Sequence, residues 1–419
     1  MAWYMKVDKI NDWKVQINIL WWGYTFLMSV AAMSLPYWPL YLSQLLPNSP
    51  KSVMYWSSLI YLAPFISAAI SAPIWGVIGD RFGYKAMLIR ACIGLFITQI
   101  LILCTVNVFL IFIIRFLQGA LAGVIVAAQA WALAISPSEK RGMIIGKLQS
   151  GLAIGELVGP LMGGIISEKF GYHSIFILSS IICLIITIIF YYMLQAPNTA
   201  NLGMKQTIQS INPWFSFKNT IRWDEAIIIL LLIITLIQLT RSIFTPFFAL
   251  FVHDQIKGGS MMVGVLYAIT ALAVFISAPL WGRYFDLRVK LNKSNYHIIS
   301  AILFVTATLQ MLHSVTNSFI SIFILRFVWG VCIGALTPAL LRILVDNDKD
   351  KQNNGVMLGI GNSSIKIGNL IGAIIGAIIL SYFGYIESFF IMTLFYCVAG
   401  ILLFIIPRLK LKKNDIKLI

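Results

Sequence analysis

The sequence predicts an all-α integral membrane protein, with 12 transmembrane helices arranged as two pseudo-symmetric six-helix bundles. Three observations predict this class: the composition, the length of the apolar runs and an internal repeat. Of the 419 residues, 59% are hydrophobic and 11% are charged, and the mean hydropathy is +0.88. A soluble fold could not bury this much apolar surface. The same figures exclude a disordered chain, a collagen and a disulfide scaffold.

Each predicted span is an unbroken apolar run. A bilayer core of about 30 Å needs roughly 20 helical residues, and the runs have this length. Strands of an outer-membrane barrel would alternate and measure about 10 residues, so the runs favour helices. In chain order, the expected spans are 16–42, 54–78, 86–106, 108–135, 144–167, 174–194, 226–252, 261–282, 297–315, 318–345, 356–381 and 387–407.

Lysine and arginine lie mostly on one side of the predicted topology. With both chain ends inside, 22 of the 31 Lys and Arg fall in inner segments or, for Lys147, at the inner end of a span, and only Lys51, Lys169 and Lys257 fall in outer ones. This asymmetry predicts cytoplasmic termini by the positive-inside rule. It also accounts for the net charge of +16, so we expect the basic segments to meet the lipid bilayer and not nucleic acid.

The two halves of the chain share sequence patterns at matching positions. Ser71–Gly76 (SAPIWG) returns as Ser277–Gly282 (SAPLWG), and Arg115 returns 211 residues later as Arg326. The pattern indicates six helices duplicated in the same orientation. It predicts an N-terminal bundle at 1–194, a cytoplasmic linker at 195–225 and a C-terminal bundle at 226–419. Parallel repeats of this kind predict a site between the halves, near the middle of the membrane, and alternating access to it.

Three motifs carry a resemblance to a known family. Gly76–Lys85 is similar to the signature GxxxDRxGR(R/K), with Tyr84 in place of the usual Arg. Arg115–Gly119 is similar to RxxQG, and Gly155–Gly164 is similar to GxxxGPxxGG. On these residues the chain resembles the major facilitator superfamily over essentially its whole length, and the third motif resembles its drug:proton antiporter branch. The resemblance implies the major facilitator fold, multidrug efflux and a place in the bacterial cytoplasmic (inner) membrane.

The first motif implies a conformational latch at the cytoplasmic end of the second helix. The resemblance implies that Asp80 pairs with charged groups and with the end of helix 11, while Gly83 permits a tight turn. The plainer alternative is a solvated salt bridge in a loop, worth under about 1 kcal/mol. Leu287 replaces Arg81 in the second copy, which predicts a weaker latch there. The latch residues are Gly76, Asp80, Arg81, Gly83, Lys85 and Asp286.

The third motif is expected to act through packing. Glycines four residues apart form one stripe on a helix, where another backbone can approach closely. Pro160 is expected to kink the helix, and Ala373 at the matching position makes this kink one-sided. Ordinary small-residue packing is the alternative. The motif residues are Gly155, Gly159, Pro160, Gly163 and Gly164, and Gly151 extends the stripe.

Charges inside the spans are the sharpest indication of function, since each costs roughly 2.5–3.5 kcal/mol on insertion scales. Glu156 is the only carboxylate well inside a span, so we expect it to carry the proton. The resemblance adds Arg115 and Asp80 as proton-coupling residues. A structural ion pair between Glu156 and Arg115 is the alternative. The first helix lacks the acid that many drug antiporters carry there.

Four cationic residues lie well inside the spans, against the single acid Glu156, and this excess predicts a positive cavity. The four are Arg115, Arg241, Arg326 and Lys366. The expected substrate is therefore a small amphiphilic or anionic molecule, such as an acidic drug, a phosphonate or a siderophore. Alternatively, some cations face lipid headgroups, and the aromatic residues belong to the interface belt or the core. The expected substrate-binding residues are Arg115, Gln118, Tyr37, Arg241, Phe247, Arg326 and Lys366.

An importer or facilitator with the same fold is the alternative function. A membrane enzyme is not expected, because the four histidines lie at scattered span ends. The five cysteines lie in apolar runs without a CxxC pair, so no metal is expected. We expect no cofactor, with the proton gradient as the energy source. The expected partners are a small-molecule substrate, protons and the bilayer, and the chain is expected to be a monomer.

Overall fold

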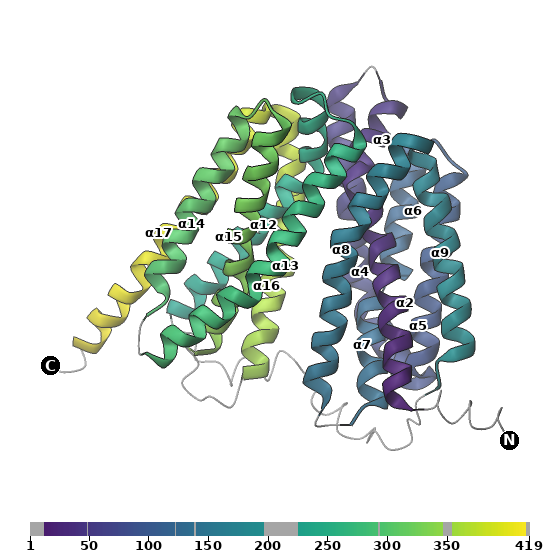
Figure 1. Cartoon of the computed structure of the whole chain (residues 1–419), viewed down its shortest axis with the longest axis horizontal. Helices are drawn as coiled ribbons and strands as arrows, with labels where there is room; N and C mark the ends of the chain where they lie inside the picture. The colour runs from purple at the N-terminus through teal and green to yellow at the C-terminus, as the bar shows by residue number, and fades with distance from the viewer. Residues whose placement is uncertain are drawn as a thin grey trace. The chain divides into compact units, whose positions relative to one another are not determined.

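The computed structural model describes residues 12–47, 49–121, 123–137, 140–196, 225–291, 294–346 and 354–415. Every regular element in these ranges is a helix (Figure 1). In the first half these are α2 (Trp13–Met33), η1 (Leu35–Tyr37), α3 (Trp38–Leu45), α4 (Pro50–Phe82), α5 (Tyr84–Leu103), α6 (Val108–Leu121), α7 (Val124–Ile135), α8 (Arg141–Phe170) and α9 (Tyr172–Met193). In the second half they are α12 (Glu225–Gln255), α13 (Ser260–Lys290), α14 (Tyr296–Leu312), η4 (His313–Val315), α15 (Phe319–Asp346), α16 (Asn354–Tyr382) and α17 (Tyr385–Asp415).

The helices follow the predicted spans. Within the described ranges, 10 helical segments are long and apolar enough to cross a membrane. The remaining two predicted spans, 54–78 and 356–381, coincide with α4 and α16, which are 33 and 29 residues long. The prediction of an all-helical membrane protein is confirmed.

Two predicted spans contain a break. The first run divides into α2, η1 and α3, because Pro36 and Pro39 have no N–H to donate to a continuous helical ladder. The fourth run divides between α6 and α7, where Gly123 has φ 119°, a value that favours glycine. Both breaks follow from backbone chemistry and leave the spans in place.

Helix α4 extends beyond the predicted span, which ended at residue 78. Asp80 and Arg81 lie in the last helical turn of α4, which ends at Phe82. The turn is made by Gly83, whose φ of 87° matches the bend expected of this glycine.

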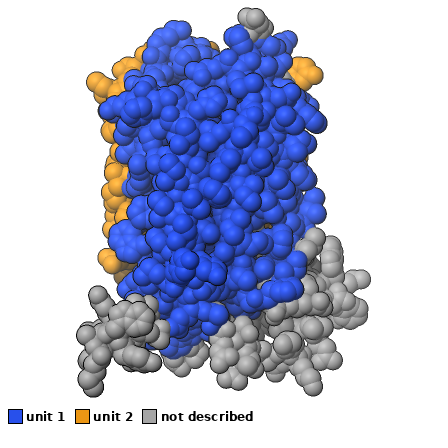
Figure 2. All heavy atoms as spheres, turned by 90° about the vertical axis from the view of Figure 1, so that its right-hand side faces the viewer, with its two compact units in different colours: residues 1–202, 248–268 blue, residues 203–247, 269–419 orange. Residues whose placement is uncertain are grey.

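The chain divides into two compact units (Figure 2). Unit 1 comprises residues 1–202 with 248–268, and unit 2 comprises 203–247 with 269–419. The end of α12 and the start of α13 therefore belong to unit 1. Most of the predicted linker lies outside the described residues, so the predicted boundaries at 194 and 226 stay a prediction.

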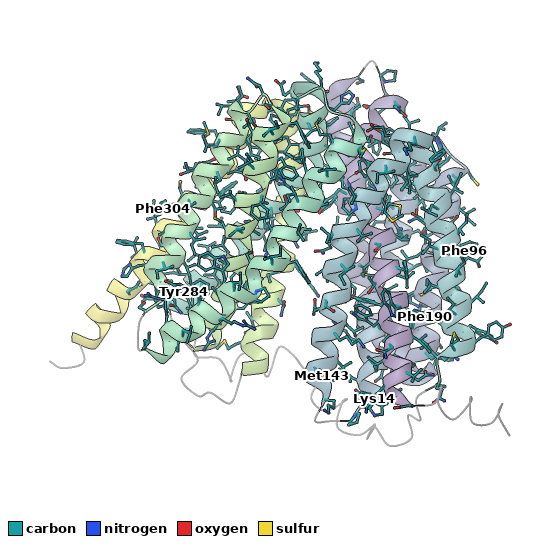
Figure 3. The ribbon with its side chains drawn as sticks, in the orientation of Figure 1. Lys14, Phe96, Met143, Phe190, Tyr284 and Phe304 are labelled. Carbon is teal, nitrogen blue, oxygen red and sulfur yellow. The ribbon has the colours of Figure 1, made fainter. Side chains whose placement is uncertain are left out.

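Each unit has its own apolar core. In unit 1, α2 packs against α8, α4 against α6 and α5 against α9 (Figure 1). Gly23 of α2 makes room for the ring of Phe190 from α9 (Figure 3). In unit 2, α14 packs against α15 and α17, and Gly400 of α17 lies beneath the ring of Phe304 (Figure 3).

The outer face of α9 is apolar and exposed. Ile177, Ile181, Leu184 and Ile188 follow helical spacing, and each side chain is 42–48% exposed. Such a contiguous apolar stripe on one helix face is typical of contact with lipid.

Candidate functional site

The glycine stripe of α8 positions this helix against α2. A Cβ atom added at Gly155 would lie 2.6 Å from Cβ of Met28 and 2.8 Å from the nitrogen of Ser29. One added at Gly159 would meet the Ser29 carbonyl oxygen and lie 3.0 Å from the nitrogen of Met33. The two backbones are in direct contact, which confirms the close approach predicted for the stripe.

Tyr37 connects the end of the first span to the proline of α8. Its hydroxyl donates a hydrogen bond to the Pro160 carbonyl oxygen at 2.5 Å, and its side chain is 1% exposed. Gly164 and Gly264 leave room for this hydroxyl, since a Cβ at either position would come within 2.8 Å of it. In unit 1, Tyr37 therefore lies among packed helices as a structural contact.

Two further contacts hold the start of α13 within unit 1. The Tyr172 hydroxyl and the Ser260 hydroxyl are 2.9 Å apart, and a Glu168 carboxylate oxygen accepts the Met261 N–H at 2.7 Å. The predicted fifth span ended at residue 167, whereas α8 continues to Phe170 and so carries this second acid. Glu168 is a residue that the sequence analysis missed.

Arg115 lies buried on α6, which starts after the capping residue Asn107. Its Nε donates to the Ile60 carbonyl oxygen at 3.3 Å, and an Nη donates to Oε1 of Gln118, one turn later. The guanidinium carbon lies 5.2 Å from the ring centre of Trp38. The structure thus brings Arg115 and Gln118 together beside an aromatic ring.

Arg326 is the matching arginine of unit 2 and is 2% exposed. Its guanidinium carbon lies 4.9 Å from the ring centre of Phe244 and 5.1 Å from that of Trp329. His313 contacts the same two rings, with centroid distances of 6.0 and 6.4 Å. The sequence analysis placed His313 at a span end, but it is fully buried.

The other expected substrate-binding residues of unit 2 have different surroundings. Arg241 is half-buried on α12, and its Nη1 donates to Oε1 of Gln238 at 3.4 Å. Phe247 is fully buried, stacked on Tyr385 at 5.9 Å and edge-on to Phe389 at 5.0 Å, as expected for a core residue. Lys366 is exposed on α16.

Glu156 lies on the exposed side of α8, one residue past the buried Gly155. Tyr24 of α2 is its electrostatic neighbour. Because proline has no N–H, Pro160 cannot donate the usual helical bond to the Glu156 carbonyl oxygen. Both the side chain and the backbone of this residue therefore differ from those of an ordinary helix interior.

Of the predicted latch residues, Lys85 makes contacts that the structure describes. The surroundings of Gly76 and the side chains of Asp80, Arg81 and Asp286 lie outside the described part of the structure. The Lys85 Nζ donates to the Tyr191 carbonyl oxygen at 2.8 Å and lies 5.8 Å from the centre of its ring. In this conformation Lys85 joins the start of α5 to the end of α9.

Known proteins resemble the chain over most of its length. "Multidrug resistance protein MdtG" of Klebsiella pneumoniae (strain 342) is 28% identical over 400 residues, covering 95% of this chain and 93% of the relative. The MdtG protein of Proteus mirabilis (strain HI4320) is 27% identical over 386 residues, covering 91% and 92%.

Solved structures share the fold at low identity. A peptide transporter in complex with sulfate has a TM-score of 0.71 at 13% identity and covers 94% of both chains. A D-xylose–proton symporter has a TM-score of 0.65 at 14% identity, covering 93% of this chain and 96% of its own.

The sequence model described as Major Facilitator Superfamily matches residues 20–293 and 230–417. Together with the relatives, this match indicates a transporter and not an enzyme. The family resemblance seen in the motifs is confirmed: the chain belongs to the Major Facilitator Superfamily.

Proposed function

We propose that the chain is a proton-coupled exporter of small amphiphilic or anionic molecules, working by alternating access in the bacterial inner membrane. The relatives that match nearly its full length are named multidrug resistance proteins. The motif on α8 resembles that of the drug:proton antiporter branch, and this resemblance supports the same direction of transport.

The observation that carries the proposed substrate class is a buried arginine beside aromatic rings in each unit. Arg115 is 7% exposed and lies by Trp38, while Arg326 is 2% exposed and lies by Phe244 and Trp329. A desolvated guanidinium attracts an anion strongly, and the ring surfaces suit an apolar body. A molecule that combines the two parts matches this chemistry better than a lipophilic cation.

Glu156 is the proposed proton carrier. Its exposed position lets it exchange protons while the packed glycine face holds the helix in place. Export of a monovalent anion with entry of one proton moves two unit charges in the favoured direction. Each is worth about 2.3 kcal/mol at 100 mV.

The test is uptake into energised inverted membrane vesicles. Two naphthalene probes of opposite charge, naphthalene-2-sulfonate and (2-naphthylmethyl)trimethylammonium, are compared at matched concentrations. We expect accumulation of the sulfonate, its loss when a protonophore is added, and its loss in Glu156→Gln. Glu387→Gln is the matched control, since Glu387 is also an exposed acid on a helix.

Three results would contradict the proposal. Accumulation of the cation alone would refute the anionic substrate. Unchanged sulfonate uptake in Glu156→Gln would remove this residue from the proton path. Sulfonate accumulation in right-side-out vesicles instead of inverted ones would indicate an importer.

A further inference from the structure

His313 is a buried histidine that the proposed function does not yet use. It begins η4, directly after α14, and none of its side chain is exposed. Its ring stacks on Phe389 of α17 at a centroid distance of 6.0 Å and also contacts Phe244 of α12 and Trp329 of α15. The imidazole is therefore enclosed by three helices of unit 2.

The hydrogen bonds of the ring fix its tautomer. Nδ1 lies 2.7 Å from the Leu309 carbonyl oxygen, which can only accept, so Nδ1 carries a hydrogen. In the neutral ring, Nε2 then has a lone pair, and this buried atom has no hydrogen-bond partner among the residues that the structure describes. A buried polar atom without a partner costs about 1–3 kcal/mol, so its retention calls for a use.

Other unpartnered polar atoms lie in the same interior. Three further buried atoms have no hydrogen-bond partner in the described part of unit 2: Oε1 of Gln310, Nε1 of Trp329 and the hydroxyl of Tyr396. Gln310 lies one turn before His313, and its Nε2 contacts Met392 Sδ at 3.7 Å, one turn before Tyr396. Together with Arg326, these side chains place a group of polar atoms inside the otherwise apolar core of unit 2.

Among the residues that the structure describes, the ionisable groups around His313 are cationic or neutral. Arg326 on α15 contacts the same rings as His313, and Arg241 on α12 and Tyr396 on α17 interact electrostatically in the same interior. Glu387, on the first turn of α17, is exposed. The positive field of the arginines opposes protonation of the ring, whereas an anion bound at Arg326 would favour it.

We infer that the interior of unit 2 binds an anionic group at Arg326, and that His313 takes up a proton on Nε2 as the anion binds. The imidazole becomes imidazolium by accepting one proton from solvent, and its new N–H donates to the anion. This inference deepens the proposed function and rests on it for the anionic substrate. The proton taken up on His313 leaves with the anion, so the net entry of one proton in the proposed function then requires two protons to move inward for each exported anion. The inference thus places a proton-binding group in unit 2 in addition to Glu156.

The internal repeat supports a specific use for this histidine. Arg115 and Arg326 are 211 residues apart. At the same offset, Gln310 corresponds to Gln99 and His313 corresponds to Ile102. Ile102 is also buried, at 1% exposure. The fold therefore accepts an ordinary apolar residue at this position, so packing alone does not require a histidine.

The test is calorimetric titration of the purified full chain with naphthalene-2-sulfonate near pH 7. Runs in two buffers with different ionisation enthalpies give the number of protons taken up per bound anion. We expect close to one proton for the unmodified chain and none for His313→Asn. Asparagine places an amide where Nδ1 stood, so it keeps the Leu309 bond and removes only Nε2.

Two further measurements define the site. Arg326→Gln is expected to weaken the binding of the sulfonate at least about tenfold, because a buried charge contact is lost. The affinity for the neutral naphthalene-2-sulfonamide is expected to change little in the same variant. Arg326→Lys, which keeps the charge, checks that folding is intact. In the unmodified chain, sulfonate affinity should fall by up to about tenfold per pH unit around pH 7, where about one proton is taken up with the anion, and should level off at higher pH, where no proton is taken up.

Several outcomes would overturn the inference. These are equal proton uptake in His313→Asn, binding without proton uptake in the unmodified chain, no sulfonate binding, or a flat affinity profile from about pH 5.5 to 8.5. Vesicle export that continues with unchanged proton coupling in His313→Asn refutes this inference alone. Linked proton uptake in calorimetry without any vesicle export refutes the proposed direction of transport alone.

Discussion

Replacing Gly159 with alanine tests whether the glycine stripe of α8 holds unit 1 together. The added Cβ would meet the Ser29 carbonyl oxygen and lie 2.8 Å from Cβ of Ala32 and 3.0 Å from the nitrogen of Met33. Two of these atoms are backbone atoms of α2, so they can move only if the whole helix shifts. Overpacking of this kind costs about 1–3 kcal/mol, and a backbone neighbour indicates the upper part of this range.

The matched control is Gly146→Ala in the same helix. A Cβ at Gly146 meets no atom of the described residues within 4 Å, so the substitution keeps only the helix-propensity gain of about 1 kcal/mol. Gly159→Ala has the same gain and the overpacking penalty as well. We therefore expect it to be about 2–3 kcal/mol less stable than Gly146→Ala.

Thermal unfolding of the detergent-purified variants measures this difference. At about 2–4 °C per kcal/mol for a unit of this size, the two midpoints should differ by about 4–12 °C, with Gly159→Ala lower. Equal midpoints would show that α2 and α8 are not in direct backbone contact, and the packing reason for the motif would be lost.

Three further predictions concern single contacts. Gly372→Ala should lower the unfolding midpoint relative to Gly282→Ala. The Cβ added at Gly372 would meet the Leu239 carbonyl oxygen, whereas one added at Gly282 meets no atom of the described residues within 4 Å. Equal midpoints would contradict matched glycine stripes in the two repeats. Tyr37→Phe should destabilise the chain by about 1 kcal/mol, because it loses the hydrogen bond to the Pro160 carbonyl oxygen. Tyr192→Phe, at a residue 79% exposed, should leave the unfolding midpoint unchanged. An unchanged midpoint in Tyr37→Phe would count against the hydrogen bond to Pro160. Glu168→Ala should speed hydrogen exchange of the Met261 amide severalfold, because the amide loses the carboxylate that accepts its hydrogen bond. Lys169→Ala should leave the exchange rate unchanged. Equal exchange rates in the two variants would show that Glu168 does not protect this amide.

The sequence predicted the spans and the packing stripe because both depend on local periodicity. A bilayer demands a continuous apolar run, and glycines four residues apart share one helix face. The break at Gly123 was not predictable in the same way. Gly119, four residues earlier, is a close-packing glycine whose Cβ would clash with Pro64, so a glycine in this run indicates either role.

The surroundings of the charged residues depend on tertiary contacts, which explains why several were missed. His313 ends an apolar run, which resembles an interface position, but η4 directs its ring into the core. The partners of Arg115 come partly from α4, 55 residues away along the chain. Only the spacing of Arg115 and Gln118 pointed to their contact.

The two repeats share their packing and differ in their polar chemistry. Gly155 and Gly159 contact α2, and their counterparts Gly368 and Gly372 contact α12 in the same manner. The two repeats differ at other buried positions: Gln118 corresponds to Trp329, and Ile102 corresponds to His313. A position in backbone contact admits no larger side chain, while a buried position next to an arginine admits any residue that fills the volume. Chemical specialisation of one half is therefore expected beside the arginines. Variants at His313 should change substrate preference more than stability, whereas variants at Gln118 also remove the acceptor of a hydrogen bond from the buried Arg115.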